Sequence, residues 1–240
     1  MEKKKVLITG ASIAGNTIAW WLFLQNSEVT VVEQAGRFRE GGQNVDVRGA
    51  GREVLRRMNL EEKVLGLSTG ELGTDWVDEN NKVIARFAVE DIGDGPTAEM
   101  EILRGDLSKL IFESAMQRAQ YRFGDRIRAV EQEHNGAWVT FGKGSREYYD
   151  MVIVAEGVGS STRELLFPDE NKARYMDLTV AYFAIPGKDS DEHFSRQYNT
   201  TGGRGPPSNP TEPGRCGCIW GFRKDRKMKT NGMPAAKSNF

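Results

Sequence analysis

The sequence is poor in the residues that build metal centres and disulfide frameworks. Of its 240 residues, two are cysteine and two are histidine. Cys216 and Cys218 form a C-x-C pair with no second pair, and His134 and His193 lie far apart along the chain. Zinc sites and disulfide scaffolds need clustered ligands or several cysteine pairs. We therefore expect reduced thiols, histidines at the surface and no bound metal.

An excess of one charge and a long apolar run are also absent. The chain has 33 basic and 34 acidic residues, whereas a nucleic-acid-binding domain usually carries a basic excess. The uncharged stretch 6–27 is interrupted by glycine and polar residues, so it predicts neither a membrane span nor a signal peptide. We expect a cytoplasmic protein whose partner is a small-molecule substrate, not nucleic acid or membrane. The sequence leaves the oligomeric state open.

A glycine turn near the N-terminus is the most informative feature. The segment 6–15 reads V-L-I-T-G-A-S-I-A-G, which predicts a buried strand, a turn and a helix from Ile13 to about Leu24. Gly10 permits a tight turn and Gly15 permits close packing of the helix against the sheet. The N-terminus of such a helix offers N–H groups and a partial positive charge to a pyrophosphate.

An acidic residue completes this nucleotide-binding pattern. Glu33 ends a second predicted strand, 28–33, and follows Gly15 by 18 positions, close to the usual spacing of about 20. Its carboxylate can bind ribose hydroxyls and would repel a 2′-phosphate, so FAD or NAD fits better than NADP. Ser12 replaces the middle glycine, and its hydroxyl can bond phosphate. The alternative is a purely structural βαβ turn.

Later segments change in character. The residues 74–89 predict a β-hairpin, and 121–130 predicts a strand. The apolar run 151–155 predicts a strand buried on both faces, followed by a second loop of small residues. From Gly202 on, proline and glycine predict an irregular tail.

A strand-to-helix junction lies between these segments, at 101–111. Asp106 is a suitable N-cap for the predicted helix. Arg104, just before it, could meet a bound phosphate or ring, or could instead pair at the surface with Glu101 or Asp106. The sequence leaves both interpretations open.

Three blocks in this order resemble the single-component (class A) FAD-dependent monooxygenases, the aromatic hydroxylase family that includes tetracycline-inactivating enzymes. The blocks are 10–15 with Glu33, the R-G-D-L segment 104–107, and A-E-G at 155–157 followed by Ser161 and Arg163. The resemblance covers roughly residues 4 to 200. It implies an α/β fold, with a Rossmann-like FAD-binding domain and an interleaved, incomplete antiparallel β substrate domain.

The resemblance also implies domain bounds and site residues. It places the FAD-binding domain at 1–72 and 99–175, a partial substrate domain at 73–98 and 176–203, and an irregular tail at 204–240. Glu156 stands where the family has aspartate, and no Gly-Asp pair follows Arg163, so the chain resembles a C-terminally truncated member. The implied cofactor-binding residues are Gly10, Ser12, Ala14, Gly15, Glu33, Asp46, Arg104, Glu156 and Gly157.

The implied function is a FAD-dependent monooxygenase that uses NAD(P)H and O₂ to hydroxylate an aromatic or polyketide-like small molecule, with no catalytic acid or base identified. The alternative is a truncated, non-catalytic nucleotide-binding remnant or interaction protein. A short-chain dehydrogenase, suggested by T-G-A-S at 9–12, is excluded. That family requires glycines where Ala14 and Asn16 stand, and none of the six tyrosines here has a lysine four residues later.

Overall fold

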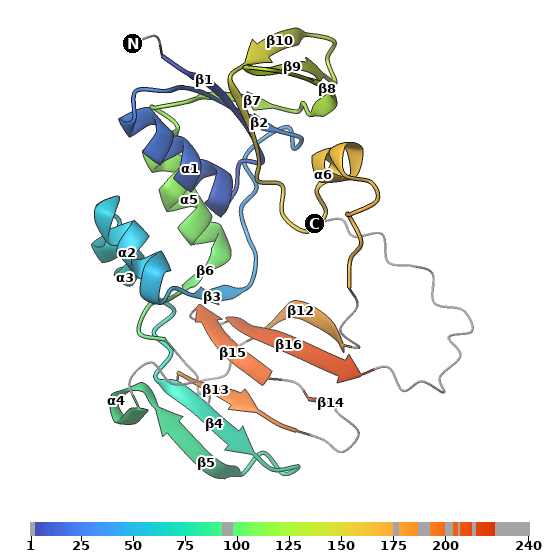
Figure 1. The fold of residues 1–240 in the computed structure, drawn as a ribbon. Coiled ribbons are helices and arrows are strands. Elements are labelled where there is room, and N and C mark those ends of the chain that lie inside the picture. The colour runs from blue at the N-terminus through green and yellow to red at the C-terminus, as the bar shows by residue number, and fades with distance from the viewer. Residues whose placement is uncertain are drawn as a thin grey trace, which may run out of the picture. The chain divides into compact units, whose positions relative to one another are not determined.

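The computed structural model describes residues 3–92, 98–174, 178–186, 193–199, 204–205, 207–212 and 215–223. They form two compact units (Figure 1). Unit 1 contains the described residues up to Leu72 and those from Val89 to Ala173, and unit 2 contains Gly73–Ala88 and the described residues from Arg174 on. Among the described residues, no helix combines the length and the apolar character needed to cross a membrane.

A parallel sheet forms the centre of unit 1. Its strand order is β11 (Met151–Val154), β1 (Lys5–Thr9), β2 (Glu28–Glu33) and β7 (Gln120–Phe123). The helix α1 (Ile13–Leu24) connects β1 to β2, and both α1 and β2 have the predicted bounds. The βαβ prediction is therefore confirmed.

Both faces of this sheet are covered (Figure 1). On one face α1 lies beside α5 (Arg104–Ala115), and Val6 and Ile8 of β1 pack into a core that includes Ala19 of α1. On the other face Leu7 packs against Phe141 and its neighbours in a three-stranded antiparallel sheet. That sheet has the order β10 (Arg146–Tyr149), β9 (Gly136–Phe141), β8 (Ile127–Glu133). Alternate side chains of β1 thus pack into two cores, one on each face of the sheet.

Two strand predictions in this unit are wrong. The single strand expected at 121–130 is two strands in different sheets, β7 and β8, because the chain turns at Gly124. The run expected to be buried on both faces, β11, is an edge strand within the described part of the sheet. Met151 and Val154 are 45% and 37% exposed. An apolar run alone does not distinguish a central strand from an edge strand.

Within the described residues, unit 1 contains six further elements. They are β3 (Asn44–Asp46), α2 (Gly49–Arg57), α3 (Glu61–Leu65), α4 (Val89–Ile92), β6 (Glu101–Leu103) and α6 (Ser161–Leu166). The antiparallel pair β3–β6, the two helices α2 and α3, and α5 share a core with Trp20. Trp20 is buried.

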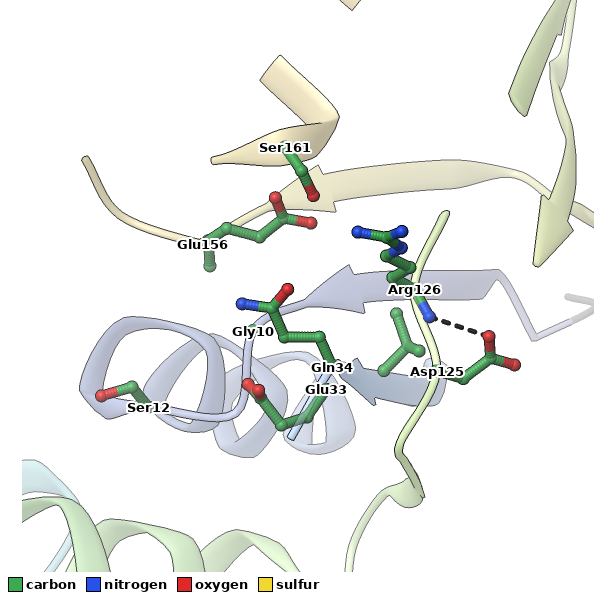
Figure 2. Close-up of a pocket in the computed structure, with 10 residues that line it drawn as sticks. Gly10, Ser12, Glu33, Gln34, Asp125, Arg126, Glu156 and Ser161 are labelled. Carbon is green, nitrogen blue, oxygen red and sulfur yellow. Dashed lines mark hydrogen bonds between the residues drawn. The ribbon is translucent and has the colours of Figure 1, made fainter. Parts of the chain in front are cut away.

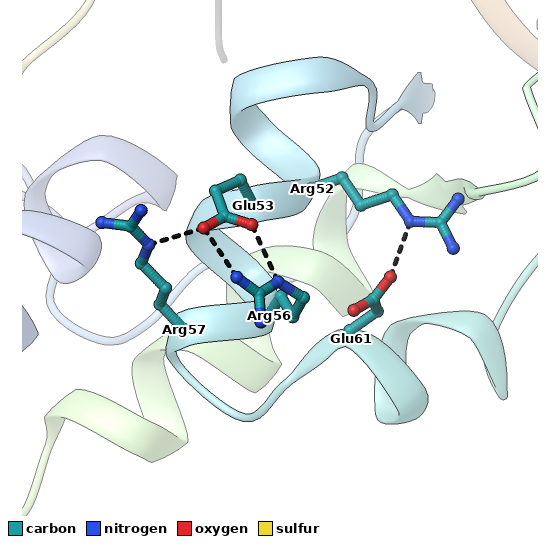
Figure 3. Close-up of polar contacts among 5 residues, drawn as sticks. All are labelled: Arg52, Glu53, Arg56, Arg57 and Glu61. Atoms are coloured by element: carbon teal, nitrogen blue, oxygen red, sulfur yellow. Dashed lines mark hydrogen bonds and ion pairs between the residues drawn. The ribbon is translucent and has the colours of Figure 1, made fainter.

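Ion pairs cross the surface of α2 and α3 (Figure 3). Glu53 accepts hydrogen bonds from Arg56 and Arg57, and Arg52 bonds Glu61 at 2.6 Å. The bonds from Arg56 and then Arg57 lower the pKa of Glu53 to about 2. These groups are solvated and stand apart from the pocket described below.

Unit 2 is a mixed β-sheet. Its path is β12 (Leu178–Pro186), β16 (Arg215–Arg223), β15 (Pro207–Glu212), β13 (Phe194–Gln197), β4 (Gly73–Val77) and β5 (Val83–Ala88), with β14 (Arg204–Gly205) beside β16. The pair β4–β5 is the predicted hairpin. The pair β13–β4 is parallel, and the others are antiparallel.

The tail expected to be irregular from residue 204 contains three of these strands. Its proline and glycine content misled the prediction, because pairing of β16 along the whole of β12 overrides local composition. Residues 93–97 and 224–240, and the thiols of Cys216 and Cys218, lie outside what the structure describes. His134 and His193 are exposed, as expected.

Candidate functional site

A small pocket lies at the carboxyl ends of β1, β2 and β11 in unit 1 (Figure 2). Its volume is about 90 Å³. Ligands of open α/β sheets bind at this edge of the sheet. Four residues predicted from sequence line it: Gly10, Ser12, Glu33 and Glu156. Six others complete the lining: Val32, Gln34, Asp125, Arg126, Ala155 and Ser161.

The turn between β1 and α1 has room for glycine only. Gly10 has φ +96°, and a Cβ there would lie 2.6 Å from the carbonyl oxygen of Ala155. A Cβ on Gly15 would lie 1.9 Å from the carbonyl oxygen of Gly10. The turn therefore approaches both β11 and its own helix more closely than any side chain permits.

The N-terminus of α1 is open to a ligand. Ser12 is the N-cap residue in an extended conformation, but its side chain caps no backbone N–H. The first turn of a helix leaves N–H groups without helical partners, and they carry a partial positive charge. Ala14 lies in this turn and is exposed, and because its methyl side chain has no polar atom it offers only its backbone for a polar contact. The Ser12 hydroxyl instead accepts a hydrogen bond from Arg104 at 3.1 Å.

Glu33 joins the glycine turn to the segment after β2. Its Oε2 accepts a hydrogen bond from the amide of Ala11 at 3.0 Å, and its Oε1 accepts one from the amide of Ala35 at 2.8 Å. A carboxylate has about four acceptor positions. The two bonds therefore fix the orientation of the carboxylate and leave capacity for hydroxyl donors from a ligand.

A second close backbone contact positions Arg104 beside the glycine turn. Its amide donates to the carbonyl of Gln43 at 2.9 Å. A Cβ on Gly105 would lie 2.4 Å from the amide nitrogen of Gly41. The loop that contains Gly41 and Gly42 thus packs directly on the start of α5. The Arg104 guanidinium therefore lies beside the glycine turn, where it bonds Ser12.

The cap predicted for α5 is wrong. The helix begins at Arg104 with Leu103 as its N-cap residue, so Asp106 lies inside the first turn. Glu101, the other suggested partner of Arg104, accepts hydrogen bonds from Asn44 and Thr69 instead. The strand β6 runs into the helix without an intervening turn, which is why the favourable cap residue goes unused.

Glu156 is held by the start of α6. Its Oε2 accepts hydrogen bonds from Ser160 Oγ at 2.9 Å and Thr162 N at 3.0 Å, and its Oε1 accepts one from Thr162 Oγ1 at 2.5 Å. Partial burial raises the pKa of this carboxyl, but the bonds from Thr162 and Ser160 outweigh it and hold the pKa below its usual value. Glu156 is therefore an anion bound to its own loop.

Arg163 fixes the backbone of the same loop. It donates to the carbonyl oxygens of Gly157 at 3.1 Å and Val158 at 2.5 Å, and to the side chain of Asn171 at 2.6 Å. Gly157 has φ +77°, a conformation that favours glycine. The loop between β11 and α6 is thus rigidly held at one wall of the pocket.

Asp46 stands apart from this group. It lies on β3, where it pairs with Arg48 at 2.8 Å, and it does not line the pocket. Three other predicted residues lie next to the pocket lining. Gly15 lies against Gly10, Arg104 bonds Ser12, and Gly157 follows Glu156 in the chain. The role of Asp46 toward a cofactor stays a prediction from the resemblance.

Sequence reasoning missed the far side of the pocket. Gln34 follows Glu33 directly and could have been considered, but Asp125 and Arg126 gave no signal. They reach the site because β7 pairs with β2, a pairing between distant segments.

Within the described residues no group of three or more His, Cys, Asp or Glu could hold a metal ion.

Comparison with known proteins shows which enzymes the chain is similar to. No model of a known protein family matches the chain. The FAD-dependent monooxygenase asL4 of Sarocladium schorii is 37% identical over 194 residues, which cover 78% of this chain and 45% of that protein. The flavin-dependent monooxygenase eupH of Phoma sp is 33% identical over 217 residues, covering 85% and 50%. Over most of its length the chain is thus similar to flavin-dependent monooxygenases. It spans about half the length of the curated relatives it matches.

Solved structures share the fold of this chain. Tetracycline destructase Tet(55) matches with a TM-score of 0.78 at 23% identity, over 95% of this chain and 59% of that one. HpxO of Klebsiella pneumoniae, solved with FAD and uric acid, matches with a TM-score of 0.76 at 17% identity, over 95% and 58%. The predicted class A monooxygenase fold is confirmed.

Proposed function

We propose that unit 1 binds FAD, and that the protein to which this chain corresponds is a monooxygenase. It would use NAD(P)H and O₂ to hydroxylate an aromatic or polyketide-like small molecule. In this proposal unit 1 is the FAD-binding domain and unit 2 is part of the substrate domain, and the protein is cytoplasmic. Once bound, FAD supplies the electron transfer and the oxygen activation.

One observation carries the cofactor assignment: the glycine turn at 10–15 has no room for a Cβ beside an open helix N-terminus. The α1 amides would bind the pyrophosphate. Glu33 would bind the ribose, since its carboxylate is oriented by two backbone amides and keeps acceptor capacity. Arg104 would add a positive charge beside the phosphates through its position at Ser12. The residues present therefore fit the ADP end of FAD.

The small-molecule substrate is proposed from the relatives and neighbours. Related structures were solved with uric acid, in HpxO, and with 2-aminobenzoylacetate, in PqsL of Pseudomonas aeruginosa. Both are compact, oxygenated and conjugated molecules, which supports a substrate of the same general kind. In this proposal the pocket residues of unit 1 bind and orient the cofactor.

The test is a FAD titration of the purified chain, followed by the visible absorption and fluorescence of the flavin. We expect saturable binding, a red-shifted or structured flavin band, and weaker binding in Glu33→Gln. Glu53→Gln is the matched control, because it removes a carboxylate from the solvated surface of α2. Failure of wild type to bind FAD would refute the cofactor assignment.

A second measurement separates the monooxygenase from the non-catalytic alternative. NAD(P)H oxidation by the FAD-loaded protein, above that of free FAD, would exclude the non-catalytic alternative. Bound FAD without such oxidation would support the alternative for this chain. The names of the relatives favour the monooxygenase.

A further inference from the structure

An apolar strand with an open edge ends the sheet of unit 2. Within the described residues β5 is the last strand of the path, and it pairs only with β4. It reads V-I-A-R-F-A, and Val83, Ile84 and Phe87 are 39%, 66% and 38% exposed. The backbone donors and acceptors along such an edge are a template for pairing with another strand.

The one charged residue of β5 does not protect this edge. Arg86 donates through Nε and Nη2 to the two carboxylate oxygens of Asp75, each at 2.7 Å. Its guanidinium also lies 3.9 Å from the centre of the Phe194 ring. Asp75 belongs to β4 and Phe194 to β13, the two strands inward from β5. Arg86 thus extends over the sheet, and β5 contains neither of the usual edge protectors, lysine and proline.

One face of β5 carries an apolar row. Val83, Ala85 and Phe87 share this face, because successive side chains of a strand alternate. Trp76 of β4 is paired with Ala85, so it lies on the same face, where it is 37% exposed. A small side chain therefore separates an exposed tryptophan from the open edge.

A second copy of the chain could continue this sheet. Two β5 strands related by a two-fold axis perpendicular to the sheet would run antiparallel, and each would use the same residues. Only a register centred on a residue keeps each face of the sheet continuous across the axis, since paired residues must share a face.

The charges select one of these registers. Centring on Ile84 would place Arg86 opposite Lys82 of the second copy, and centring on Arg86 would place the two Arg86 side chains opposite each other. Like charges in directly opposite positions destabilise a sheet. Centring on Ala85 places Arg86 opposite Ile84 and Lys82 opposite Ala88, so no like charges meet.

The same register also matches the apolar row to itself. Val83 of each copy would face Phe87 of the other, an aromatic and β-branched pair of the kind that stabilises sheets. The two Ala85 side chains would meet at the axis, with one Trp76 beside each. The row would then read large, small, small, large, which lets both tryptophans lean over the axis.

We propose that β5 is a homodimerisation edge, which pairs antiparallel with β5 of a second copy of this chain in the register centred on Ala85. The partner is thus the same chain, and the sheet of unit 2 continues through both copies. This inference goes beyond the proposed function and does not depend on it.

The experiment is sedimentation velocity over a concentration series for wild type, Ile84→Lys and Ile84→Glu. The two variants lose the same exposed side chain and gain a charge of opposite sign, so each is the matched control of the other. By symmetry position 84 faces Arg86 twice in the dimer. We expect wild type to dimerise, and Ile84→Lys to dimerise about tenfold or more weakly than Ile84→Glu, since two partly exposed charge contacts change sign.

A cross-link tests the register directly. Opposite Cα atoms of an antiparallel pair lie about 4.5 or 5.5 Å apart, within reach of a disulfide. We expect Ala85→Cys to form a disulfide-linked dimer under mild oxidation by dissolved oxygen. Val83→Cys places an equally accessible thiol on the same strand but four residues out of register with itself, so it should not link. The wild-type chain, with Cys216 and Cys218, gives the background.

Several results would overturn the inference. They are a wild-type chain that stays monomeric throughout the series, equal dimerisation of the two Ile84 variants, and cross-linking of Val83→Cys as readily as Ala85→Cys. A monomer whose β5 amides are protected from hydrogen exchange would show that another part of the same chain covers the edge, and would overturn it too. Circular dichroism verifies that each variant is folded. None of these measurements needs FAD, so this inference and the proposed function can fail separately.

Discussion

A buried polar pair beneath the glycine turn gives a quantitative test of how the turn is supported. Asn16 of α1 is fully buried. Its Nδ2 donates to the carbonyl of Ala11 at 3.2 Å, and its Oδ1 accepts from the hydroxyl of Tyr121 at 2.9 Å. Burial raises the pKa of Tyr121, so the phenol stays protonated and remains a donor throughout the neutral range.

Tyr121→Phe removes this donor and little else. The ring keeps its contacts, because Tyr121 packs edge-on against Phe112 and parallel to Phe123 at centroid distances of 5.0 and 6.0 Å. The change leaves a buried amide oxygen without its partner, which costs about 1–3 kcal/mol. With a urea m-value of about 2 kcal/mol/M, the unfolding midpoint should fall by roughly 1 M.

The assay is urea unfolding followed by tryptophan fluorescence, since Trp20 lies in the core that α1 shares with its neighbours, and by circular dichroism as a second probe. Tyr148→Phe is the control, because the Tyr148 hydroxyl makes no hydrogen bond in the described structure. Asn16→Leu and the double variant complete a cycle, in which we expect a coupling of about 1 kcal/mol between Asn16 and Tyr121. A midpoint for Tyr121→Phe within error of the control would refute the reasoning.

Three further predictions follow from single contacts. Gly15→Ala places a Cβ 1.9 Å from the Gly10 carbonyl oxygen, so it should abolish FAD binding in a spectral titration and lower the thermal midpoint; retained binding would show that the turn can shift. Glu53 should titrate by NMR at about pH 2, moving toward 4.5 in Arg56→Gln. Because its folded pKa is lowered, its stabilisation is present above about pH 4.5 and disappears as the pH falls toward 2. Glu156→Gln should cost about 1–2 kcal/mol at pH 7 and less at pH 3, since the wild-type carboxyl also has a lowered pKa; an equal cost at both pH values would contradict this.

The parts of the fold that were predictable depend on neighbours in sequence. The helix Ile13–Leu24 and the strand Glu28–Glu33 have the expected bounds because a strand, a glycine turn and a following apolar helical segment are local signals. The same holds for the hairpin of β4 and β5. Local chemistry therefore sufficed for the turn at Gly10 and for the acid that follows it.

The parts that were not predictable depend on pairing between distant segments. Arg104 reaches Ser12 across 92 positions, and it does so because Gly105 packs on the backbone of Gly41. At Gly41 the backbone lies so close to the start of α5 that no side chain fits on Gly105. Arg126 enters the pocket only through the β2–β7 pairing. Neither contact leaves a periodic signal in the sequence.

Glu156 shows how a departure from a family pattern can be absorbed locally. A glutamate is one methylene longer than the aspartate of the resembling proteins, and here its two oxygens accept three hydrogen bonds from Ser160 and Thr162. Those bonds use most of the hydrogen-bonding capacity of the carboxylate and direct it to the start of α6. Because Arg163 separately holds the carbonyls of Gly157 and Val158, the loop keeps its shape by two independent sets of bonds. The wall that this loop presents to the pocket is therefore set by its backbone, and the longer acid need not add a free charge beside a bound phosphate.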